Sequence, residues 1–228
     1  MNTNQWSELR SDRALAFRTR PAASNDERLL VLLHGVGGNE TNLAALGAAA
    51  PADTRVVLAR GPLTLGPGQH AWFQVSFGPQ GPRPDLAAAE SSRLQLARFI
   101  AEMQSEFSVT ASKTVVAGFS QGGIMSASIG LTLPERVAGF GILAGRILPE
   151  LAPQISDRAS LAGVRAFIGH GRDDSKLPVE WAYKADAWLK ELGVNHDMQL
   201  YPGDHGIPPQ MQADFMRWFE QVTNSHGS

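Results

Sequence analysis

The sequence predicts an α/β fold in which a mostly parallel sheet is covered by helices on both faces. Short apolar runs of strand length alternate along the chain with longer amphipathic or Ala- and Leu-rich segments. Such alternation is typical of parallel strands joined by helical crossovers. The 228 residues show neither an internal repeat nor a long linker. We therefore expect one domain, 1–228, with residues 1–12 and 223–228 peripheral or frayed.

The expected elements follow from apolar runs, caps and breakers. Strands are expected at 28–33, 54–59, 113–117, 137–143, 164–168 and 196–201. Helices are expected at 41–50, 85–107, 123–133, 180–192 and 209–222. Pro51 ends the first helix, Asp85 is placed to cap the second, and Gly193 closes the fourth. The long helix is expected to bury an apolar stripe made of Leu86, Leu94, Ala97, Ile100 and Met103.

Composition excludes several classes of function. The chain has 20 basic and 22 acidic residues, so neither a nucleic-acid partner nor an anionic membrane surface is expected. It has no cysteine, which excludes disulfides, thiolate catalysis and cysteine-bound zinc. An N-terminal apolar signal and an apolar run of membrane-spanning length are both missing, so we expect a cytoplasmic protein with no integral membrane association. Metal-ligand spacing is also missing, so no metal or cofactor is expected.

The most informative stretch, 114–123, joins a β-type run through Gly-Phe-Ser-Gln-Gly to a helix-like segment. That is the strand–turn–helix context in which a nucleophilic serine is presented. The turn is too sharp for side chains on either side of the serine, and Gly118 and Gly122 remove them. Ser120 is therefore the candidate nucleophile, expected in a strained backbone conformation.

A serine nucleophile needs a base and an acid that orients the base. In one large class of serine hydrolases the chain order is Ser, then Asp or Glu, then His. Of the six histidines, His205 alone follows both Ser120 and an acidic loop at the carboxyl end of a predicted strand. In that loop Asp173 and Asp174 are adjacent, and spacing does not choose between them. Asp204 is disfavoured because the side chains of neighbouring residues diverge.

With these residues in place, the chain resembles the phospholipase/carboxylesterase family of the α/β-hydrolases, which includes acyl-protein thioesterases. The matching motifs occur in the family's order over about residues 28–220: Leu-His-Gly-Val-Gly-Gly (33–38), Arg-Gly-Pro (60–62), Ala-Trp-Phe (71–73), Gly-Phe-Ser-Gln-Gly-Gly (118–123), His-Gly-x-x-Asp-x-x-Leu-Pro (170–178) and Gly-x-His (203–205). The resemblance implies an α/β-hydrolase fold, and the short gaps between motifs leave no room for a large cap domain. It also implies that Asp174 is the acid, with Leu177 replacing the family's Val. Gln74 stands where the family often has Asp, which leaves substrate preference open.

The developing oxyanion of an acyl transfer needs fixed hydrogen-bond donors. The backbone N–H of the residue after the nucleophile, Gln121, is one candidate. The resemblance implies that the N–H of Val36 is the second, with Gly35, Gly37 and Gly38 letting the backbone come close. The alternative interpretation of these glycines is an ordinary tight turn. They do not form a dinucleotide-binding fingerprint.

One segment, 61–84, is rich in Gly and Pro and shows little regular pattern, and a structureless loop of this length is often functional. We expect its apolar residues to form an acyl groove, with 146–161 as a possible opposite wall. The alternative is that the two aromatic residues anchor the loop to the core. The expected substrate-binding residues are Leu63, Leu65, Trp72, Phe73 and Leu177.

The expected activity is that of a serine hydrolase that cleaves carboxylic esters with short to medium acyl chains through an acyl-enzyme. An acyl-(protein) thioesterase or a lysophospholipase would use the same triad, so both stay open. A peptidase is a more distant alternative, because the sequence shows no propeller or large cap domain. A ligand-binding hydrolase fold without activity is another, and it is disfavoured because the triad residues are all present. The expected partner is a small ester or thioester, and the expected state a monomer or weak homodimer.

Overall fold

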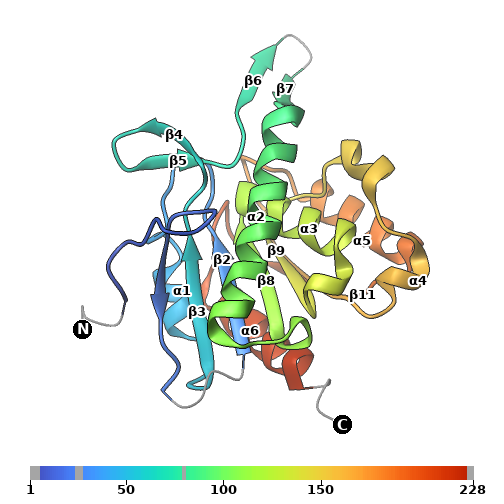
Figure 1. Ribbon diagram of the computed structural model, residues 1–228. Helices are drawn as coiled ribbons and strands as arrows, with labels where there is room; N and C mark the ends of the chain where they lie inside the picture. Colours follow the sequence, from blue (N-terminus) through green and yellow to red (C-terminus); the bar gives the residue numbers. More distant parts are fainter. Residues whose placement is uncertain (1–5, 24–27, 79–80, 225–228) are drawn as a thin grey trace.

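The computed structural model describes residues 6–23, 28–78 and 81–224. Its centre is a seven-stranded sheet in the order β1-β3-β2-β8-β9-β10-β11 (Figure 1). β1 runs antiparallel to β3, and all other neighbours are parallel. The strands are β1 (Phe17–Arg20), β2 (Arg28–Leu33), β3 (Thr54–Ala59), β8 (Thr114–Phe119), β9 (Gly139–Leu143), β10 (Arg165–Gly171) and β11 (Asn195–Tyr201). The predicted class of fold is confirmed, and β1 is an edge strand that the pattern did not predict.

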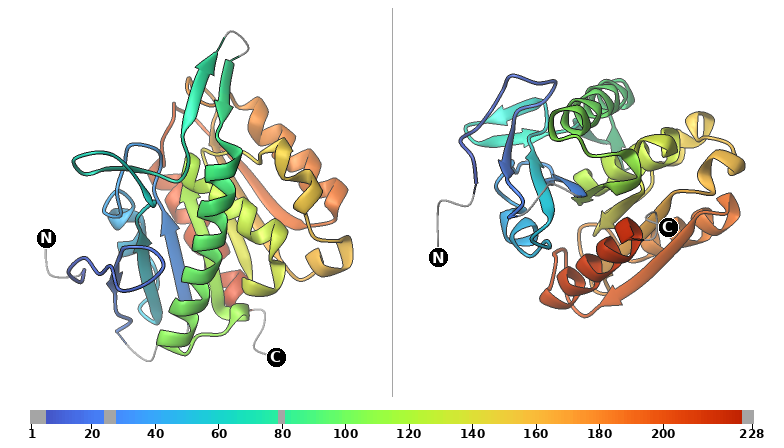
Figure 2. Two further views of the ribbon diagram at one scale, coloured as in Figure 1. Left: turned by 45° about the horizontal axis from the view of Figure 1, so that its top comes forward. Right: turned by 60° about the horizontal axis from the view of Figure 1, so that its bottom comes forward.

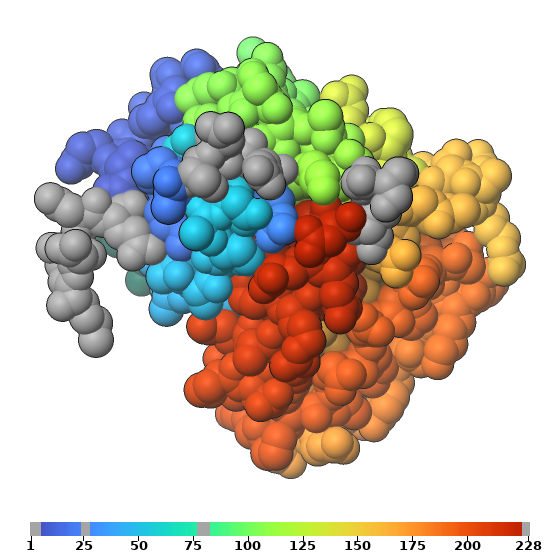
Figure 3. Space-filling view, turned by 90° about the horizontal axis from the view of Figure 1, so that it is seen from below, coloured from blue at the N-terminus to red at the C-terminus, as the bar shows by residue number. Residues whose placement is uncertain are grey.

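Helices cover both faces of this sheet (Figure 2). They are α1 (Ala44–Ala48), α2 (Leu86–Phe107), α3 (Gln121–Thr132), α4 (Arg158–Leu161), α5 (Glu180–Leu192) and α6 (Pro209–Asn224). One buried cluster contains side chains of α2, α3 and α5, and a second contains those of α1 and α6. Seen from below, α6 lies in red beside cyan residues of the α1–β3 region (Figure 3). Short 3-10 helices occupy Ala111–Lys113, Pro134–Arg136 and Pro149–Gln154.

The longest helix, α2, begins where the sequence predicts. The carboxylate of Asp85 accepts a hydrogen bond from the N–H of Ala88 at 3.0 Å, which caps the first turn. The predicted apolar stripe is partly wrong, because Leu86 and Leu94 are 46% and 55% exposed. The buried stripe consists of Leu96, Phe99, Ile100 and Met103. Leu94 lies two positions before that stripe begins, and two positions correspond to about 200° around a helix.

The first helix is shorter than predicted, since 41–50 contains only the five helical residues of α1. The side chain of Asn39 accepts hydrogen bonds from the N–H and the hydroxyl of Thr41, at 3.0 and 2.6 Å. These local bonds stabilise a turn where the Ala- and Leu-rich composition alone favours helix.

The segment 61–84 is not structureless, which corrects the sequence-based expectation. It forms two antiparallel hairpins, β4 (Leu63–Gly66) with β5 (Gln69–Ala71) and β6 (Val75–Gly78) with β7 (Gly81–Pro84). Every strand of a two-stranded hairpin is an edge strand, and edge strands tolerate proline. Residues 79–80, which separate β6 from β7 in the sequence, lie outside the described residues. Both hairpins lie near the carboxyl ends of the parallel strands (Figure 1).

The segment before β1 is peripheral but attached to the rest of the fold. Arg10 forms a β-bridge with Phe17, and its guanidinium pairs with Glu106 of α2. At the other end of the chain, Thr223 and Asn224 complete α6, while residues 1–5 and 225–228 lie outside the described residues. Within the described ranges, no helix is both long enough and apolar enough to cross a lipid bilayer.

Candidate active site

Three loops at the carboxyl edge of the sheet bring Ser120, His205 and Asp174 together. His205 Nε2 lies 3.0 Å from Ser120 Oγ, and His205 Nδ1 lies 2.7 Å from Asp174 Oδ2. Ser120 directly follows β8, whereas Asp174 and His205 lie in the loops after β10 and β11. These strands belong to one parallel run, so their carboxyl ends meet at the same edge.

The backbone at Ser120 is strained, with φ 53° and ψ −114°, a region that residues other than glycine rarely adopt. The two flanking glycines make this turn possible. A Cβ at Gly118 would lie 2.3 Å from the carbonyl carbon of Gly122, and a Cβ at Gly122 would lie 2.1 Å from the carbonyl oxygen of Leu33. The N–H of Ser120 donates to the carbonyl of Leu143 at 2.8 Å, which joins the turn to β9.

The carboxylate of Asp174 is fully buried and held from two sides. Its Oδ1 accepts from the backbone N–H groups of Lys176 and Leu177, at 2.9 and 2.8 Å, and its Oδ2 accepts from His205 Nδ1–H. This arrangement leaves His205 Nε2 free to accept the hydroxyl proton of Ser120. The adjacent Asp173 is exposed, and its carboxylate lies 3.4 Å from the N–H of Gly203. Sequence spacing does not distinguish the two aspartates, but in the structure it is Asp174 whose carboxylate contacts the His205 ring.

His170, at the end of β10, lies directly beneath this carboxylate. Its Nε2–H donates to the carbonyl of Leu177 at 2.8 Å and lies 3.3 Å from Asp174 Oδ2. The ring is completely buried. The polar contacts of His170 are therefore with Leu177 and Asp174 and not with Ser120.

Asp204 has a role that the sequence did not indicate. Its Oδ1 accepts from Ser175 N–H at 2.7 Å, from Ser175 Oγ at 2.9 Å and from His205 N–H at 2.7 Å. The bonds from the backbone N–H groups of Ser175 and His205 lower the pKa of the Asp204 carboxyl. The side chain thus joins the loop of the acid to the loop of the histidine. Aspartate is common in turns because its carboxylate can accept from the backbone N–H that follows, as Asp204 does from His205. Its bonds to Ser175 in the other loop are visible only in the fold.

Two backbone N–H groups near Ser120 are available to an incoming oxyanion. Gly37 N–H donates to His70 and Gly38 N–H donates to Gly35, whereas the N–H groups of Val36 and Gln121 have no acceptor within residues 6–23, 28–78 and 81–224. Gln121 begins α3, where the first N–H groups of a helix have no intrahelical partner.

The loop 34–38 comes close to Ser120 and is held in place by hydrogen bonds of His34. A Cβ at Gly35 would lie 3.4 Å from Ser120 Cβ, so this backbone lies against the turn that carries Ser120. His34 is buried; its Nε2 accepts from Gly61 N–H at 2.9 Å, and its Nδ1–H donates to the carbonyl of Gly35 at 2.6 Å. Burial lowers the pKa of His34, which favours this neutral form.

Trp72 and Phe73 are 0% and 1% exposed, which favours the anchoring alternative over the predicted groove for these two residues. The side chain of Gln121 binds their backbone, since Oε1 accepts from Trp72 N–H and Nε2 donates to the carbonyl of Phe73, both at 2.8 Å. The indole N–H of Trp72 also donates to the carbonyl of His34 at 2.9 Å. These bonds therefore connect the hairpin segment to Gln121 and to the start of the loop that carries Val36.

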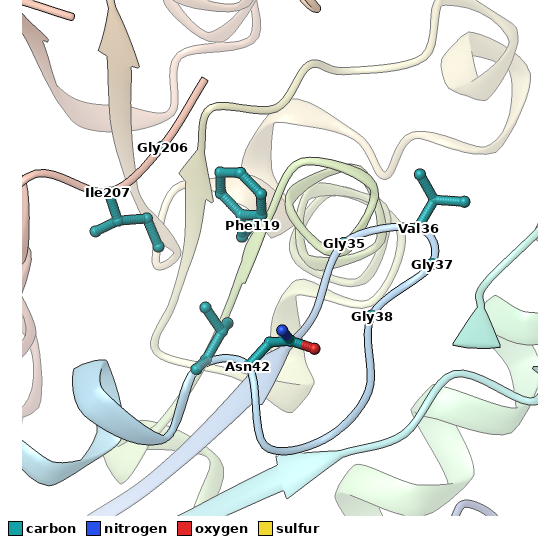
Figure 4. Close-up of a pocket in the computed structure, with 9 residues that line it drawn as sticks. Gly35, Val36, Gly37, Gly38, Asn42, Phe119, Gly206 and Ile207 are labelled. Carbon is teal, nitrogen blue, oxygen red and sulfur yellow. The ribbon is translucent and has the colours of Figure 1, made fainter. Parts of the chain in front are cut away.

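The pocket beside the triad has a volume of about 420 Å³ and lies where the sequence did not predict it. Its lining consists of Gly35, Val36, Gly37, Gly38, Asn42, Leu43, Phe119, Gly206 and Ile207. Figure 4 shows the loop 35–38 curving past Phe119, with Ile207 on the other side. The Phe119 ring centroid is 4.8 Å from that of His205.

None of the predicted substrate-binding residues lines this pocket. Leu63 and Leu177 are half-buried, and Leu65 is 45% exposed on the first hairpin. Phe119 occupies a variable position of the Gly-x-Ser-x-Gly pattern, so the motif itself did not single it out. Within the described ranges, no group of three or more His, Asp or Glu side chains is arranged to hold a metal ion.

The fold and the arrangement of this edge define an α/β-hydrolase. The family model described as phospholipase/carboxylesterase matches residues 16–223, so the chain belongs to that family. Membership supports a hydrolase activity of the esterase or thioesterase kind, and the predicted resemblance is confirmed.

Individual relatives and solved structures have low sequence identity to this chain but match it over most of its length. Acyl-protein thioesterase 1 of Kluyveromyces lactis is 24% identical, covering 91% of this chain and 97% of that protein. Acyl-protein thioesterase 1 of Debaryomyces hansenii is 28% identical over 66% of each chain. The structure of esterase PE8 matches with a TM-score of 0.77 at 26% identity, covering 90% and 97%. The carboxylesterase from Mesorhizobium loti matches with a TM-score of 0.81 at 24% identity, covering 94% and 98%, which shows the shared fold.

Proposed function

We propose that this protein is a serine hydrolase that cleaves carboxylic esters with short to medium acyl chains through an acyl-enzyme on Ser120. The observation that carries the proposal is the continuous hydrogen-bonded path from Ser120 Oγ through His205 to the buried carboxylate of Asp174, at 3.0 and 2.7 Å. Such a path gives a weak nucleophile its base and gives the base a fixed tautomer.

In the first half-reaction His205 Nε2 takes the proton of Ser120 Oγ as the oxygen attacks the ester carbonyl carbon. The carbonyl oxygen becomes an oxyanion, which accepts from the N–H groups of Val36 and Gln121. Asp174 stabilises the imidazolium. The ester C–O bond then breaks, and His205 returns the proton to the departing alcohol. Water repeats the sequence on the acyl-enzyme and releases the carboxylic acid and free Ser120.

The size of the acyl group follows from the pocket beside His205. At about 420 Å³, with apolar side chains from Leu43, Phe119 and Ile207, it suits a short or medium acyl chain. Thioester hydrolysis is a second candidate, because the similarity to the thioesterase of Kluyveromyces lactis spans almost its whole length. The same triad serves both reactions.

The test is hydrolysis of 4-nitrophenyl acetate, butyrate, octanoate and palmitate by the native chain, Ser120→Ala and Ser112→Ala. Ser112 precedes β8 at the opposite edge of the sheet and serves as the control. We expect activity to peak at short or medium chains, to fall on the order of 10³-fold or more in Ser120→Ala and to persist in Ser112→Ala. Activity that survives in Ser120→Ala rejects the nucleophile. A matched thioester series decides between the two substrate classes.

A further inference from the structure

A half-buried arginine, Arg146, lies at the same edge of the sheet as the candidate triad. Arg146 follows β9, and β9 lies between β8, which carries Ser120, and β10, which leads to Asp174. A Cβ at the preceding Gly145 would lie 2.9 Å from the carbonyl oxygen of Ser120. The backbone that presents Arg146 therefore contacts the nucleophile turn.

The Arg146 guanidinium lies over the ring of Trp181, 4.4 Å from its centroid. Trp181 belongs to the first turn of α5, which follows the loop of Asp174. The Lys184 ammonium lies 4.3 Å from the centroid of the same ring. Two cations therefore share one aromatic side chain directly beside the loop that carries the acid.

Stacking on Trp181 uses the face of the guanidinium and not its N–H donors. Within the part of the chain that the structure describes, Arg146 has no hydrogen bond to a protein acceptor and no carboxylate within 4.0 Å. Burial lowers the pKa of Arg146, an effect that the more distant charge of Glu150 opposes. Desolvating a charge costs free energy that an ion pair or hydrogen bonds normally offset. The planar, five-donor guanidinium matches a carboxylate or phosphate bidentately.

We infer that Arg146 recognises an anionic group of the substrate, so that the preferred ester carries a carboxylate or a phosphate close to its scissile bond. The inference rests on the proposed ester hydrolysis and names its substrate class. The anion can belong to the acyl part or to the alcohol part. Arg146 would act on binding and on position, while the triad carries the chemistry.

Two matched substrate pairs test the inference and separate the two sources of charge. Mono-4-nitrophenyl glutarate and 4-nitrophenyl pentanoate differ by a carboxylate at the end of the acyl chain. The acetate ester of 4-hydroxyphenyl phosphate and 4-methylphenyl acetate differ by a phosphate on the alcohol. Each pair is assayed with the native chain, Arg146→Met, Arg146→Lys and the control Arg136→Met. Arg136 is about half exposed and precedes β9, at the other end of that strand.

In at least one pair we expect Arg146→Met to lower kcat/KM for the anionic ester on the order of tenfold or more, with about twofold or less change for the neutral ester. Arg146→Lys is expected to be intermediate, and Arg136→Met to leave the anionic-to-neutral ratio unchanged. The responsive pair identifies the source of the anion. An unchanged ratio in both pairs, or an equal loss for both members of each, overturns the inference and leaves a packing role on Trp181.

A binding measurement separates this outcome from failure of the proposed function. If the native chain cleaves no ester in any pair, the proposed function fails. Calorimetric titration of the native chain and Arg146→Met with glutarate and with phenyl phosphate then tests anion recognition alone. We expect binding of one anion to weaken about tenfold or more in the variant. Equal binding in both proteins, or none in either, overturns the inference.

Discussion

The buried side chain of Gln121 allows a sharp test of how the hairpins are attached to the nucleophile turn. Its amide accepts from Trp72 N–H and donates to the carbonyl of Phe73. In Gln121→Glu the shape is conserved and the acceptor remains. The second carboxyl oxygen faces the Phe73 carbonyl, and only the protonated acid can donate to it.

The sign of the pH effect follows from this geometry. Burial and the facing carbonyl raise the pKa of the introduced carboxyl in the folded state above its unfolded value of about 4.3. The unfolded chain then releases its proton first as pH rises. The variant is therefore closest to native stability below about pH 4.3 and loses stability as pH rises through the folded pKa. The loss is about 1.4 kcal/mol per pH unit, so a shift of ~2 units corresponds to about 3 kcal/mol.

The assay is urea unfolding at pH 5, 6.5 and 8, followed by tryptophan fluorescence, on the native chain, Gln121→Glu and Gln74→Glu. Gln74 is exposed and close in sequence to the two anchored residues, so the control adds the same charge outside the buried contact. We expect the difference in unfolding free energy between the native chain and Gln121→Glu to widen as pH rises. The corresponding difference for Gln74→Glu should stay small. A Gln121→Glu gap that is the same at pH 5 and pH 8 would refute the reasoning.

Three further predictions concern the loops around Ser120. Gly122→Ala places a Cβ 2.1 Å from the carbonyl oxygen of Leu33, a backbone atom that no rotamer change can move; we expect a loss of about 3 kcal/mol or more by urea unfolding, and native-like stability would contradict this packing. Burial lowers the pKa of His34, so the unfolded chain takes up its proton first as pH falls below about 6.5. The unfolding free energy of the native chain then falls by up to about 1.4 kcal/mol per pH unit. His34→Gln should then show a shallower dependence of unfolding free energy on pH between 6.5 and 5, and an unchanged slope would count against a neutral buried ring. Asp204→Ala removes the bonds from Ser175, so we expect kcat to fall about tenfold with KM little changed; an unchanged kcat would mean that the two loops hold their positions without this carboxylate.

The candidate nucleophile could be proposed from the sequence because its requirements are local. A strand, a turn with two glycines and a helix follow one another within ten residues, and this pattern indicates Ser120 as the candidate. Proposing His205 as the base required only the order of residues along the chain and its position after the carboxyl end of a predicted strand. Asp174 was different, because Asp173 beside it has the same chemistry. In the sequence, only the family resemblance distinguishes the two aspartates. In the structure they differ in that Asp174 is buried and accepts from two backbone N–H groups.

The substrate side could not be predicted in the same way, because it depends on contacts between distant segments. Trp72 and Phe73 lie in a segment rich in Gly and Pro, which gives no periodicity to show that they face the core. The pocket instead combines the β2–α1 connection, which supplies the glycine loop and Leu43, with Phe119 at the end of β8 and Ile207 after β11. The edge strand β1 was not predicted because its four residues, Phe-Arg-Thr-Arg, contain no apolar run. In the fold, Arg18 pairs with the buried carboxylate of Glu40 at 3.1 Å.

The most direct test of the central claim is to identify the residue that a fluorophosphonate modifies. The native chain, Ser120→Ala and Asp174→Asn are treated with the reagent and analysed by intact mass and peptide mapping. We predict one adduct per native chain, located on Ser120, none on Ser120→Ala, and much slower labelling of Asp174→Asn, because its histidine loses the partner that sets its tautomer. An adduct at another residue, or equal labelling of the native chain and Ser120→Ala, would contradict the assignment of Ser120 as the activated nucleophile.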